Sequence, residues 1–551
     1  MGPVRRVVVA GGGTAGYFAA LALKRQLPAL DVTLVESSKI PIIGVGEATT
    51  TLMPPFLHQQ LGIDIVDLYR EVRPTWKLGI NFEWGLPGDY RFAYTFGDTS
   101  LLEAFAHDGT IENQSLVAMM MAADRTPIVR RDDGTPLSLL PEVKFAYHLD
   151  NKPFVAYLAK VARGAEIHHV DAVIRDATTV DGEAIDRLLL DDGRELRADL
   201  YVDATGFRAL LIEKILGSPF TSFASSLFCD SAVVATVPQR GTIEPYTTAE
   251  TMDAGWCWRI PVEGEDHRGY VYSSAHLTPE AAQAEMRGKN PGLGEPWSLR
   301  FRSGRHREFW KGNTVAIGNS YGFVEPLEST TLHMVIVEIA YLLGGLEAPG
   351  DGRDYRTFAN RSIGAHWDDL RWFLTAHYKF NRKTDTAFWR DCREGADISG
   401  LAPILDRFAR LGPWLETDAD RFASGDPAFG YQGLMTVLLG QQVPCPRPAA
   451  TSLTKSAWEA RVAESRSLVA RAIPQADALQ LLRRRPELLE ELVASQESWV
   501  NNGDERITGV DPKGGLLHPP RRGRRKAGPY AHLLQGVRRP RPGGPAPPDR
   551  H

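Results

Sequence analysis

A glycine-rich segment near the N-terminus has the residue types and spacing of a dinucleotide-binding loop. Gly11-Gly12-Gly13-Thr14-Ala15-Gly16 fits the pattern G-x-G-x-x-G and stands between an apolar run and a helical pattern. In such a loop Gly11 permits a tight turn, Gly13 lets the backbone approach a pyrophosphate, and Gly16 lets helix and strand pack closely. The helix N-terminus adds free N–H groups and a partial positive charge. We therefore predict that this segment binds the phosphates of a dinucleotide.

An acidic residue and two later segments narrow the choice of nucleotide. Glu36 lies twenty residues after Gly16, where a carboxylate accepts hydrogen bonds from a ribose diol and disfavours a 2′-phosphate. This leaves FAD or NAD. Residues 200–206 and 314–319 each predict a strand that ends in a turn with glycine, which lets backbone approach a flavin. Chains that wrap an extended FAD commonly have both segments in this order, so we predict FAD.

A parallel sheet is the element that would place these strand ends side by side. The sequence predicts strands at 7–10 and 32–35 with a helix at 17–26 between them, then a helix at 154–161 and strands at 167–170 and 198–202. Residues 226–275 predict a mixed or antiparallel sheet, and 331–346, 352–392 and most of 403–500 predict helices. We therefore predict an α/β fold: a Rossmann-type, GR2-like FAD-binding fold with an added mixed β-sheet and a mostly helical C-terminal lobe.

The predicted organisation has three parts. Residues 1–350 would bind FAD and carry the inserted sheet, and residues 351–516 would form a helical lobe that covers the substrate. Residues 517–551 carry a net charge of +8 and are rich in Pro, Gly and Arg. Such a composition buries too little apolar surface to order itself, so we predict a disordered tail, with a docking segment for an acidic partner as the alternative.

Composition excludes several other classes of protein. The chain has a net charge of −5, so residues 1–516 are acidic, which argues against nucleic acid as the main partner. No apolar run reaches the roughly 20 residues of a membrane helix, and the N-terminus lacks a signal-peptide pattern. We expect a cytoplasmic protein that is not in a membrane. The four cysteines, Cys229, Cys257, Cys392 and Cys445, have neither disulfide-framework nor zinc-site spacing, so we predict reduced thiols and no metal.

Four further segments make a specific resemblance. They are Gly255-Trp256-Cys257-Trp258-Arg259-Ile260-Pro261, which contains W-x-W-x-I-P, then Trp76-Lys77-Leu78-Gly79-Ile80, Glu325-Pro326-Leu327-Glu328-Ser329-Thr330 and Gly44-Val45-Gly46-Glu47-Ala48-Thr49. From about residue 5 to about residue 445, the chain resembles flavin-dependent halogenases of the tryptophan halogenase type. The resemblance implies FADH₂ supplied by a separate reductase, with O₂ and chloride or bromide as co-substrates.

The resemblance also assigns roles to individual residues. Lys77 corresponds to the essential lysine, which would hydrogen-bond hypochlorous acid or form a chloramine with it. Glu328 corresponds to the active-site glutamate, which would stabilise the arenium cation and take its proton. The predicted halide site is Thr330 and Thr331; the family usually has Gly at the second position, and a β-branched residue disfavours positive φ. The predicted FAD-binding residues are Gly11, Gly13, Thr14, Ala15, Gly16, Glu36, Gly46, Glu47, Ala48, Asp203, Gly206, Asn319 and Leu332.

The predicted substrate is an indole. Trp256, Trp258, Ile260 and Pro261 would shield the substrate from the flavin, and Tyr94 and Phe96 stand where the family sandwiches the indole. Enzymes of free tryptophan also carry a tyrosine pair followed by a glutamate, whereas this chain has residues 429–435, Phe-Gly-Tyr-Gln-Gly-Leu-Met. Because an unpaired zwitterion is costly to bury, we predict a tryptophan within a peptide, or another indole.

Two other functions remain open at this point. A single-component FAD-dependent aromatic monooxygenase would need an open path from flavin to substrate, which the tryptophan motif disfavours. A non-catalytic FAD-binding protein would not need Lys77 and Glu328 in these contexts. Each residue also has a plain structural interpretation: Lys77 at the surface, the two tryptophans in a core strand, and Glu328 as a helix cap. The sequence predicts neither the ring position nor the oligomeric state.

Overall fold

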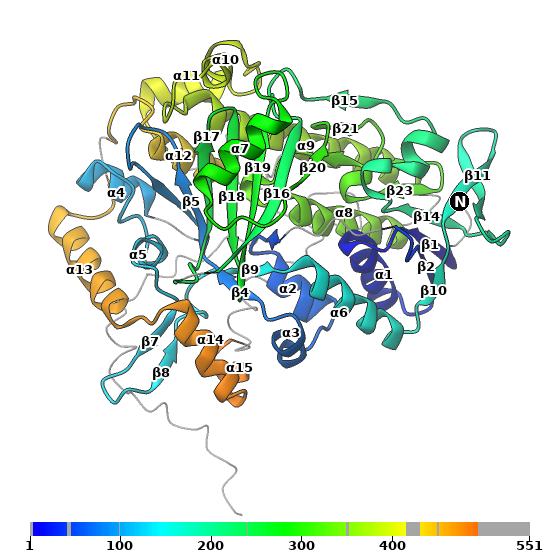
Figure 1. Ribbon diagram of the computed structural model, residues 1–551, viewed down its shortest axis with the longest axis horizontal. Coiled ribbons are helices and arrows are strands. Elements are labelled where there is room, and N and C mark those ends of the chain that lie inside the picture. The colour runs from blue at the N-terminus through cyan, green and yellow to red at the C-terminus, as the bar shows by residue number, and fades with distance from the viewer. Residues whose placement is uncertain are drawn as a thin grey trace, which may run out of the picture.

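The computed structural model describes residues 4–40, 46–97, 100–239, 241–348, 352–414, 430–448 and 451–493. The predicted tail, residues 517–551, lies outside these ranges. Figure 1 shows the nucleotide-binding part around the N-terminus on one side, a tall central sheet, and helices from the C-terminal half around it.

A six-stranded sheet in the order β10-β2-β1-β14-β23-β22 forms the first layer of the described chain. All neighbouring strands are parallel except β22 and β23. The strands are β1 (Arg6–Ala10), β2 (Asp31–Glu36), β10 (His168–Asp171), β14 (Leu200–Asp203), β22 (Trp310–Lys311) and β23 (Thr314–Ala316). Because β1 is apolar and buried from Val7 onward, it takes the central position that a hydrophobic run predicts. The predicted α/β fold and its first βαβ unit are confirmed.

Three helices pack together beside this sheet. They are α1 (Thr14–Gln26), α6 (Asn151–Gly164) and α8 (Thr330–Glu347), and α1 contacts both others. Helix α8 is long and apolar enough to cross a membrane, but 61% of it is buried inside the protein. Its apolar surface is used in packing against α1 and against α9 (Arg353–Phe380).

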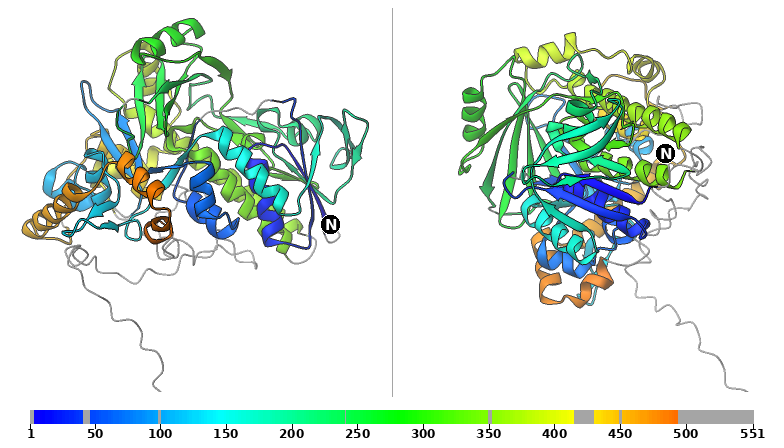
Figure 2. Two further views of the ribbon diagram at one scale, coloured as in Figure 1. Left: turned by 60° about the horizontal axis from the view of Figure 1, so that its bottom comes forward. Right: turned by 90° about the vertical axis from the view of Figure 1, so that its right-hand side faces the viewer.

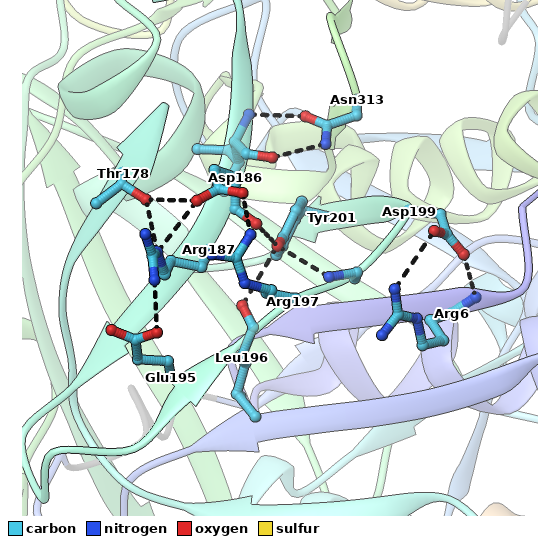
Figure 3. A network of polar contacts seen from close by, with 12 residues as sticks. Arg6, Thr178, Asp186, Arg187, Glu195, Leu196, Arg197, Asp199, Tyr201 and Asn313 are labelled. Carbon is cyan, nitrogen blue, oxygen red and sulfur yellow. Dashed lines mark hydrogen bonds and ion pairs between the residues drawn. The ribbon is translucent and has the colours of Figure 1, made fainter. Parts of the chain in front are cut away.

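A small antiparallel sheet, β11 (Ile174–Val180), β12 (Ala184–Leu190) and β13 (Glu195–Leu196), is joined to the parallel sheet by polar contacts. Figure 3 shows Tyr201 of β14 at their centre. Its hydroxyl donates to the carbonyl of Asp186 at 3.0 Å and accepts from the N–H of Ala198 at 3.0 Å. The side chain of Asn313 pairs with both backbone groups of Ile185. These contacts hold the start of segment 200–206, which runs along β14 and into the turn that follows it.

A seven-stranded sheet forms the second layer, in the order β20-β16-β19-β18-β17-β5-β6. Its pairs are antiparallel except for β17 and β5, so the mixed sheet predicted within residues 226–275 is confirmed. The strands are β5 (Gly79–Glu83), β6 (Phe92–Thr95), β16 (Ser231–Pro238), β17 (Thr247–Met252), β18 (Gly255–Pro261), β19 (Glu265–Tyr272) and β20 (Trp297–Arg300).

A third sheet carries the predicted catalytic lysine. It has the order β3-β9-β4, with β3 (Glu47–Ala48), β9 (Ala146–Leu149) and β4 (Thr75–Lys77). The remaining strands are β7 (Ile128–Arg130), β8 (Pro136–Ser138), β15 (Phe220–Ser222), β21 (Gly304–His306) and β24 (Gly322–Phe323). Strand β4 lies directly before β5, so the small sheet leads into the seven-stranded one.

Helices from the C-terminal half of the chain cover the sheets. They are α9, α10 (Ala387–Gly395), α11 (Ala402–Leu411), α12 (Gly430–Gly440), α13 (Lys455–Arg471), α14 (Gln475–Arg484) and α15 (Glu487–Leu492); earlier helices are α2 (Met53–Pro55), α3 (Ile65–Glu71), α4 (Leu101–Asp108), α5 (Leu116–Ala122) and α7 (Pro279–Lys289). The helix predicted over 352–392 is interrupted at 381–386, where the side chain of Asn381 accepts from the N–H of Gly85 instead. Helix α13 contacts β7. The orange segments, which include α14, lie on the side of the molecule away from the N-terminus (left view of Figure 2).

Candidate active site

A cavity of about 360 Å³ opens at the carboxyl ends of the parallel strands. It is lined by eleven of the thirteen predicted FAD-binding residues: Gly11, Gly13, Thr14, Ala15, Glu36, Gly46, Glu47, Ala48, Gly206, Asn319 and Leu332. In parallel α/β sheets, nucleotides bind in this position. The cavity also reaches Trp258 and Ile260 of β18 and Ser329 and Thr331 at the start of α8. The phosphate loop and the predicted halide site therefore share one space.

The glycine loop has the shape that a pyrophosphate needs. Gly11 has φ +120°, and a Cβ on Gly16 would lie 1.9 Å from the carbonyl oxygen of Gly11. These two positions require glycine for the turn and for the contact between helix and strand. By contrast, the space in front of Gly13 is open, with no atom within 4 Å of an added Cβ among the described residues. The loop thus packs tightly at Gly11 and Gly16 and leaves its backbone open at Gly13, so it fits a bound dinucleotide.

Glu36 lies at the edge of this loop. Its Oε1 accepts from the hydroxyl of Tyr17 at 2.6 Å and contacts Nε2 of His169 at 2.6 Å. Its Oε2 stands 1.4 Å from the place where a Cβ of Gly12 would be. Any side chain at Gly12 would therefore displace Glu36. This middle glycine, which the pattern G-x-G-x-x-G leaves unspecified, has a function that the sequence prediction missed.

Asp203 has a different position from the predicted one. It is fully buried and is not among the residues that line the cavity. Its carboxylate accepts from the N–H and hydroxyl of Thr205 and from the N–H groups of Leu211 and Ile212. All of its hydrogen-bonding capacity is used to hold the turn after β14. Asp203 therefore shapes the loop that carries Gly206, and Gly16 likewise acts from behind the cavity wall.

The tryptophan motif forms strand β18. Because side chains alternate along a strand, Trp256, Trp258 and Ile260 share one face, whereas Cys257 joins a separate cluster on the other face. The two indoles are 6.0 Å apart, and Trp258 and Ile260 line the cavity. A Cβ on Gly269 of β19 would lie 1.9 Å from the Trp258 ring. Pro261 lies beyond the cavity, where its carbonyl accepts from the hydroxyl of Thr75 at 2.8 Å.

Lys77 is fully buried at the end of β4. Its Nζ donates to the carbonyl of Thr49 at 3.0 Å and to Oγ of Ser329 at 2.6 Å, and it lies 5.1 Å from the centre of the Phe96 ring. Burial lowers the pKa of Lys77 to about 7, against an opposing attraction from Glu328. The structure thus excludes a surface lysine. Because Ser329 also lines the cavity, the amine lies one hydroxyl away from it.

Glu328 is equally buried, at the end of the short 3₁₀ turn Pro326–Glu328. Its Oε1 is 2.7 Å from Nε2 of His377, and its Oε2 has no hydrogen-bond partner among the described residues. Burial raises the pKa of Glu328, while His377 and Lys77 lower it. Glu328 does not cap helix α8, whose N-cap position is Ser329. One carboxylate oxygen is therefore held and the other is available for chemistry.

Comparison with known proteins identifies the family that has this combination of a glycine loop, a tryptophan motif, a buried lysine and a buried glutamate. The family model described as tryptophan halogenase matches residues 6–455. The chain belongs to the tryptophan halogenase family. The 7-chloro-L-tryptophan 6-halogenase KtzR of Kutzneria sp. (strain 744) is 33% identical over 81% of this chain and 93% of its own length. The tryptophan 7-halogenase RebH of Lentzea aerocolonigenes is 31% identical over 74% of this chain and 82% of its own length.

Solved structures agree with these relatives. The crystal structure of MibH, a lanthipeptide tryptophan 5-halogenase, is similar with a TM-score of 0.84 and 44% identity, covering 91% of this chain and 99% of MibH. Tar14, a tryptophan C-6 flavin-dependent halogenase from taromycin biosynthesis, has a TM-score of 0.80 and 30% identity, covering 87% of this chain and 100% of Tar14. The GR2-like α/β fold is thus that of the flavin-dependent halogenases.

The predicted halide site of this tryptophan halogenase family member lies at the N-terminus of α8. Thr330 and Thr331 are the first two residues of the helix, and the left-handed conformation falls on Ser329, with φ 59°. A β-branched residue disfavours positive φ, so the backbone at position 331 was left open by the sequence. Thr331 lies within α8 and is not among the described residues with positive φ, so its side chain is compatible with the local backbone.

The predicted indole-binding residues lie beside this centre. Tyr94 and Phe96 are both buried, and the Tyr94 ring packs edge-on against Phe373 of α9 at 6.2 Å. Burial raises the pKa of Tyr94, and the charge of Glu328 raises it further. The phenol and the carboxylate are therefore near each other. Helix α12 contacts β6. Residue 429 lies outside the described ranges, and Gly430–Gly440 place Tyr431 near Trp414, with ring centres 5.7 Å apart.

Sequence reasoning missed five residues of this site. Ser329, Thr49 and Gly12 lie inside motifs that the sequence already singles out, so their positions were a signal for a role in the site. Gln475 and His377 lie outside these motifs and gave no such signal. Gln475 is fully buried and accepts from the N–H of Trp76, one residue before Lys77, across almost four hundred residues. Because the two residues are so far apart in the sequence, no local pattern indicates that they are partners.

Proposed function

We propose that this protein is an FADH₂-dependent halogenase that chlorinates the indole ring of a tryptophan residue within a peptide, as a step in natural-product biosynthesis. FADH₂ would come from a separate flavin reductase, and chloride or bromide and O₂ are the co-substrates. The observation that carries the proposal is Lys77: a fully buried amine held by Thr49 and Ser329, next to Glu328 and beside a cavity with a dinucleotide loop.

The cofactor would be held by the loop Gly11–Gly16, Glu36 and the residues of 46–48 that line the cavity. When bound, the reduced flavin supplies the chemistry that turns O₂ and chloride into hypochlorous acid. Thr330 and Thr331 offer the free N–H groups and positive end of α8 to the halide. Trp258 and Ile260 stand between this space and the rest of the sheet, so that a bulky indole would be kept out.

Lys77 would receive the oxidant after it leaves the cavity. With its pKa lowered to about 7, a large share of the side chain is a neutral amine near neutral pH. A neutral amine can hydrogen-bond hypochlorous acid, or exchange N–H for N–Cl with release of water. Glu328 would then take the proton from the chlorinated ring carbon through its free Oε2. Tyr94 and Phe96 would hold the ring flat between these two groups.

A peptide substrate is supported by two features. MibH, the relative with 44% identity, is described as acting on a lanthipeptide tryptophan. In this chain, Tyr431 is followed by Gln432 and Gly433, and residues 430–440 contain no acidic residue to pair with the ammonium group of a free amino acid. Such a pairing would be needed because an unpaired charge is costly to bury.

The test supplies the purified protein with FAD, a flavin reductase, NADH, O₂ and chloride. Tryptophan-containing peptides and free tryptophan are offered separately, and products are examined by mass spectrometry for the chlorine isotope pattern. We expect chlorinated peptide, and none from the variant Lys77→Met, while the exposed control Lys455→Met keeps activity. A hydroxylated product would instead show a monooxygenase. Efficient chlorination of free tryptophan with no reaction on peptides would refute the peptide substrate alone.

A further inference from the structure

His377 forms a buried pair with Glu328 that no sequence motif indicated. The histidine comes from α9 and the glutamate from the turn before α8, and both side chains are fully buried. Their Nε2 and Oε1 atoms are 2.7 Å apart. In the sequence, His377 lies within the helix predicted over 352–392, and no motif includes it. Its position makes it the direct neighbour of the carboxylate that the proposed function requires.

The hydrogen bonds of His377 fix the number of protons in the pair. Its Nδ1 is 2.9 Å from the carbonyl oxygen of Phe373, and a carbonyl only accepts, so Nδ1 carries a hydrogen. The 2.7 Å contact with Glu328 then needs one further proton between Nε2 and Oε1. The pair is either imidazolium with carboxylate or neutral imidazole with carboxylic acid. In both states one mobile proton is shared.

The surroundings of the pair hold both groups in place. The His377 ring packs against Phe82 of β5 at 5.2 Å and against Phe373 at 5.0 Å, and its backbone carbonyl accepts from Nε1 of Trp84 at 2.9 Å. The other titratable groups that act on Glu328 are Lys77 from β4 and Tyr94 from β6. With water excluded, the carboxylate depends on His377 for its only hydrogen bond among the described residues.

We propose that His377 is the positioning residue for Glu328: its Nε2 holds Oε1, and Oε2 is left to face the indole. The inference rests on the proposed function. In the step that it supports, the C–H bond of the chlorinated ring carbon breaks, its electron pair restores the aromatic ring, and the proton goes to Oε2. Where Lys77 hydrogen-bonds hypochlorous acid, the proton then passes to the hydroxide left behind, which gives water. Where Lys77 carries N–Cl, water has already been released, and the proton passes to the lysine nitrogen and restores its N–H. A protonated Glu328 could not act in this way.

The main test compares His377→Gln with a matched control, His366→Gln. His366 lies on the same helix and makes the same contact with the carbonyl four residues earlier, at 2.7 Å, but it does not contact Glu328. Three quantities are measured: kcat against pH, KM for the peptide, and the isotope effect on kcat when the tryptophan ring is deuterated. Formation of hypochlorous acid is followed separately with a chemical trap.

In His377→Gln, we expect kcat near neutral pH to fall by at least about tenfold with little change in KM, because a general base contributes about a hundredfold or more. Burial raises the pKa of Glu328, and the contact with His377 lowers it, so without this contact the pKa is higher and the ionised form and the activity appear at higher pH. Proton removal becomes slow, and a primary isotope effect larger than that of the wild type appears. His366→Gln changes none of these. A wild-type pH profile and isotope effect in folded His377→Gln would overturn the proposal.

A spectroscopic measurement covers the case in which His377→Gln does not fold. NMR of wild-type protein with ¹⁵N-labelled histidine should show one ring with a hydrogen on Nδ1 and a shared proton at Nε2, and this signal should change in Glu328→Gln. Absence of such a histidine would overturn the proposal. Because this measurement needs no turnover, it tests the pair even if the wild-type protein chlorinates nothing, which would refute the proposed function instead.

Discussion

Replacement of Gln475 by leucine should loosen the strand that carries Lys77. Gln475, the first residue of α14, is fully buried and bridges two segments. Its Oε1 accepts from the N–H of Trp76 at 2.8 Å, and its Nε2 donates to the carbonyl of Glu244 at 3.1 Å. Strand β4 is an edge strand of its sheet, paired only with β9, so the side chain takes the place of a neighbouring strand.

The structure sets the size of this effect. Leucine has a similar volume but no polar atoms, so Gln475→Leu leaves one buried N–H and one carbonyl without partners. Each unpaired group costs about 1–3 kcal/mol, and Glu244 is partly exposed, so we expect about 2–4 kcal/mol in total. Misplacement of a reacting group by about 1 Å can lower a rate about a hundredfold. Chlorination should therefore fall further than the formation of hypochlorous acid, which does not require Lys77.

The assay measures the free energy of unfolding, the rate of peptide chlorination and the yield of trapped hypochlorous acid. The control is Gln480→Leu, an exposed position on the same helix, which should match the wild type in all three. If Gln475→Leu is as stable as the control and chlorinates as fast, the bridge does not position β4. Equal loss of chlorination and of hypochlorous acid would also refute the reasoning, because it would place the defect at the flavin.

Three further predictions concern Lys77, the Trp258 indole and the glycine loop. Since burial lowers the pKa of Lys77 to about 7, its neutral form and peptide chlorination should increase as pH rises through about 7, and Lys77→Arg, which stays charged, should lose chlorination while still releasing hypochlorous acid. Gly269→Ala should push the Trp258 indole into the cavity and cost about 1–3 kcal/mol, seen as a lower melting temperature and weaker FAD binding by fluorescence titration; unchanged binding would mean that the ring moves elsewhere. Gly12→Ala should displace Glu36 and raise the FAD dissociation constant by about tenfold, a loss of about 1.4 kcal/mol, whereas Gly288→Ala, at an exposed position of α7 with open space around it, should leave it unchanged.

Local patterns predicted the elements that line the cavity and failed where partners are distant. The strands around Gly11 and Glu36 and the sheet around Trp258 follow from short-range periodicity, and their residues line the cavity as expected. The helix over 352–392 was wrong at its middle, because the side chain of Asn381 makes tertiary contacts that compete with helical hydrogen bonds. The sequence did not indicate the positive φ of Ser329, because the conformation of a turn depends on where the helix starts.

Helix α9 contributes side chains to the candidate active site. Glu325 directly precedes a 3₁₀ turn and Glu328 is the last residue of that turn, and both are fully buried. The consecutive residues His377 and Tyr378 of α9 face them: His377 contacts Glu328, and Tyr378 lowers the pKa of Glu325, which burial raises to about 7. Burial raises the pKa of both carboxylates, and side chains from one turn of α9 are among the groups that lower them. A substitution at His377 or Tyr378 should therefore change the protonation of these two carboxylates without replacing any residue of the glycine loop, Lys77 or the predicted halide site.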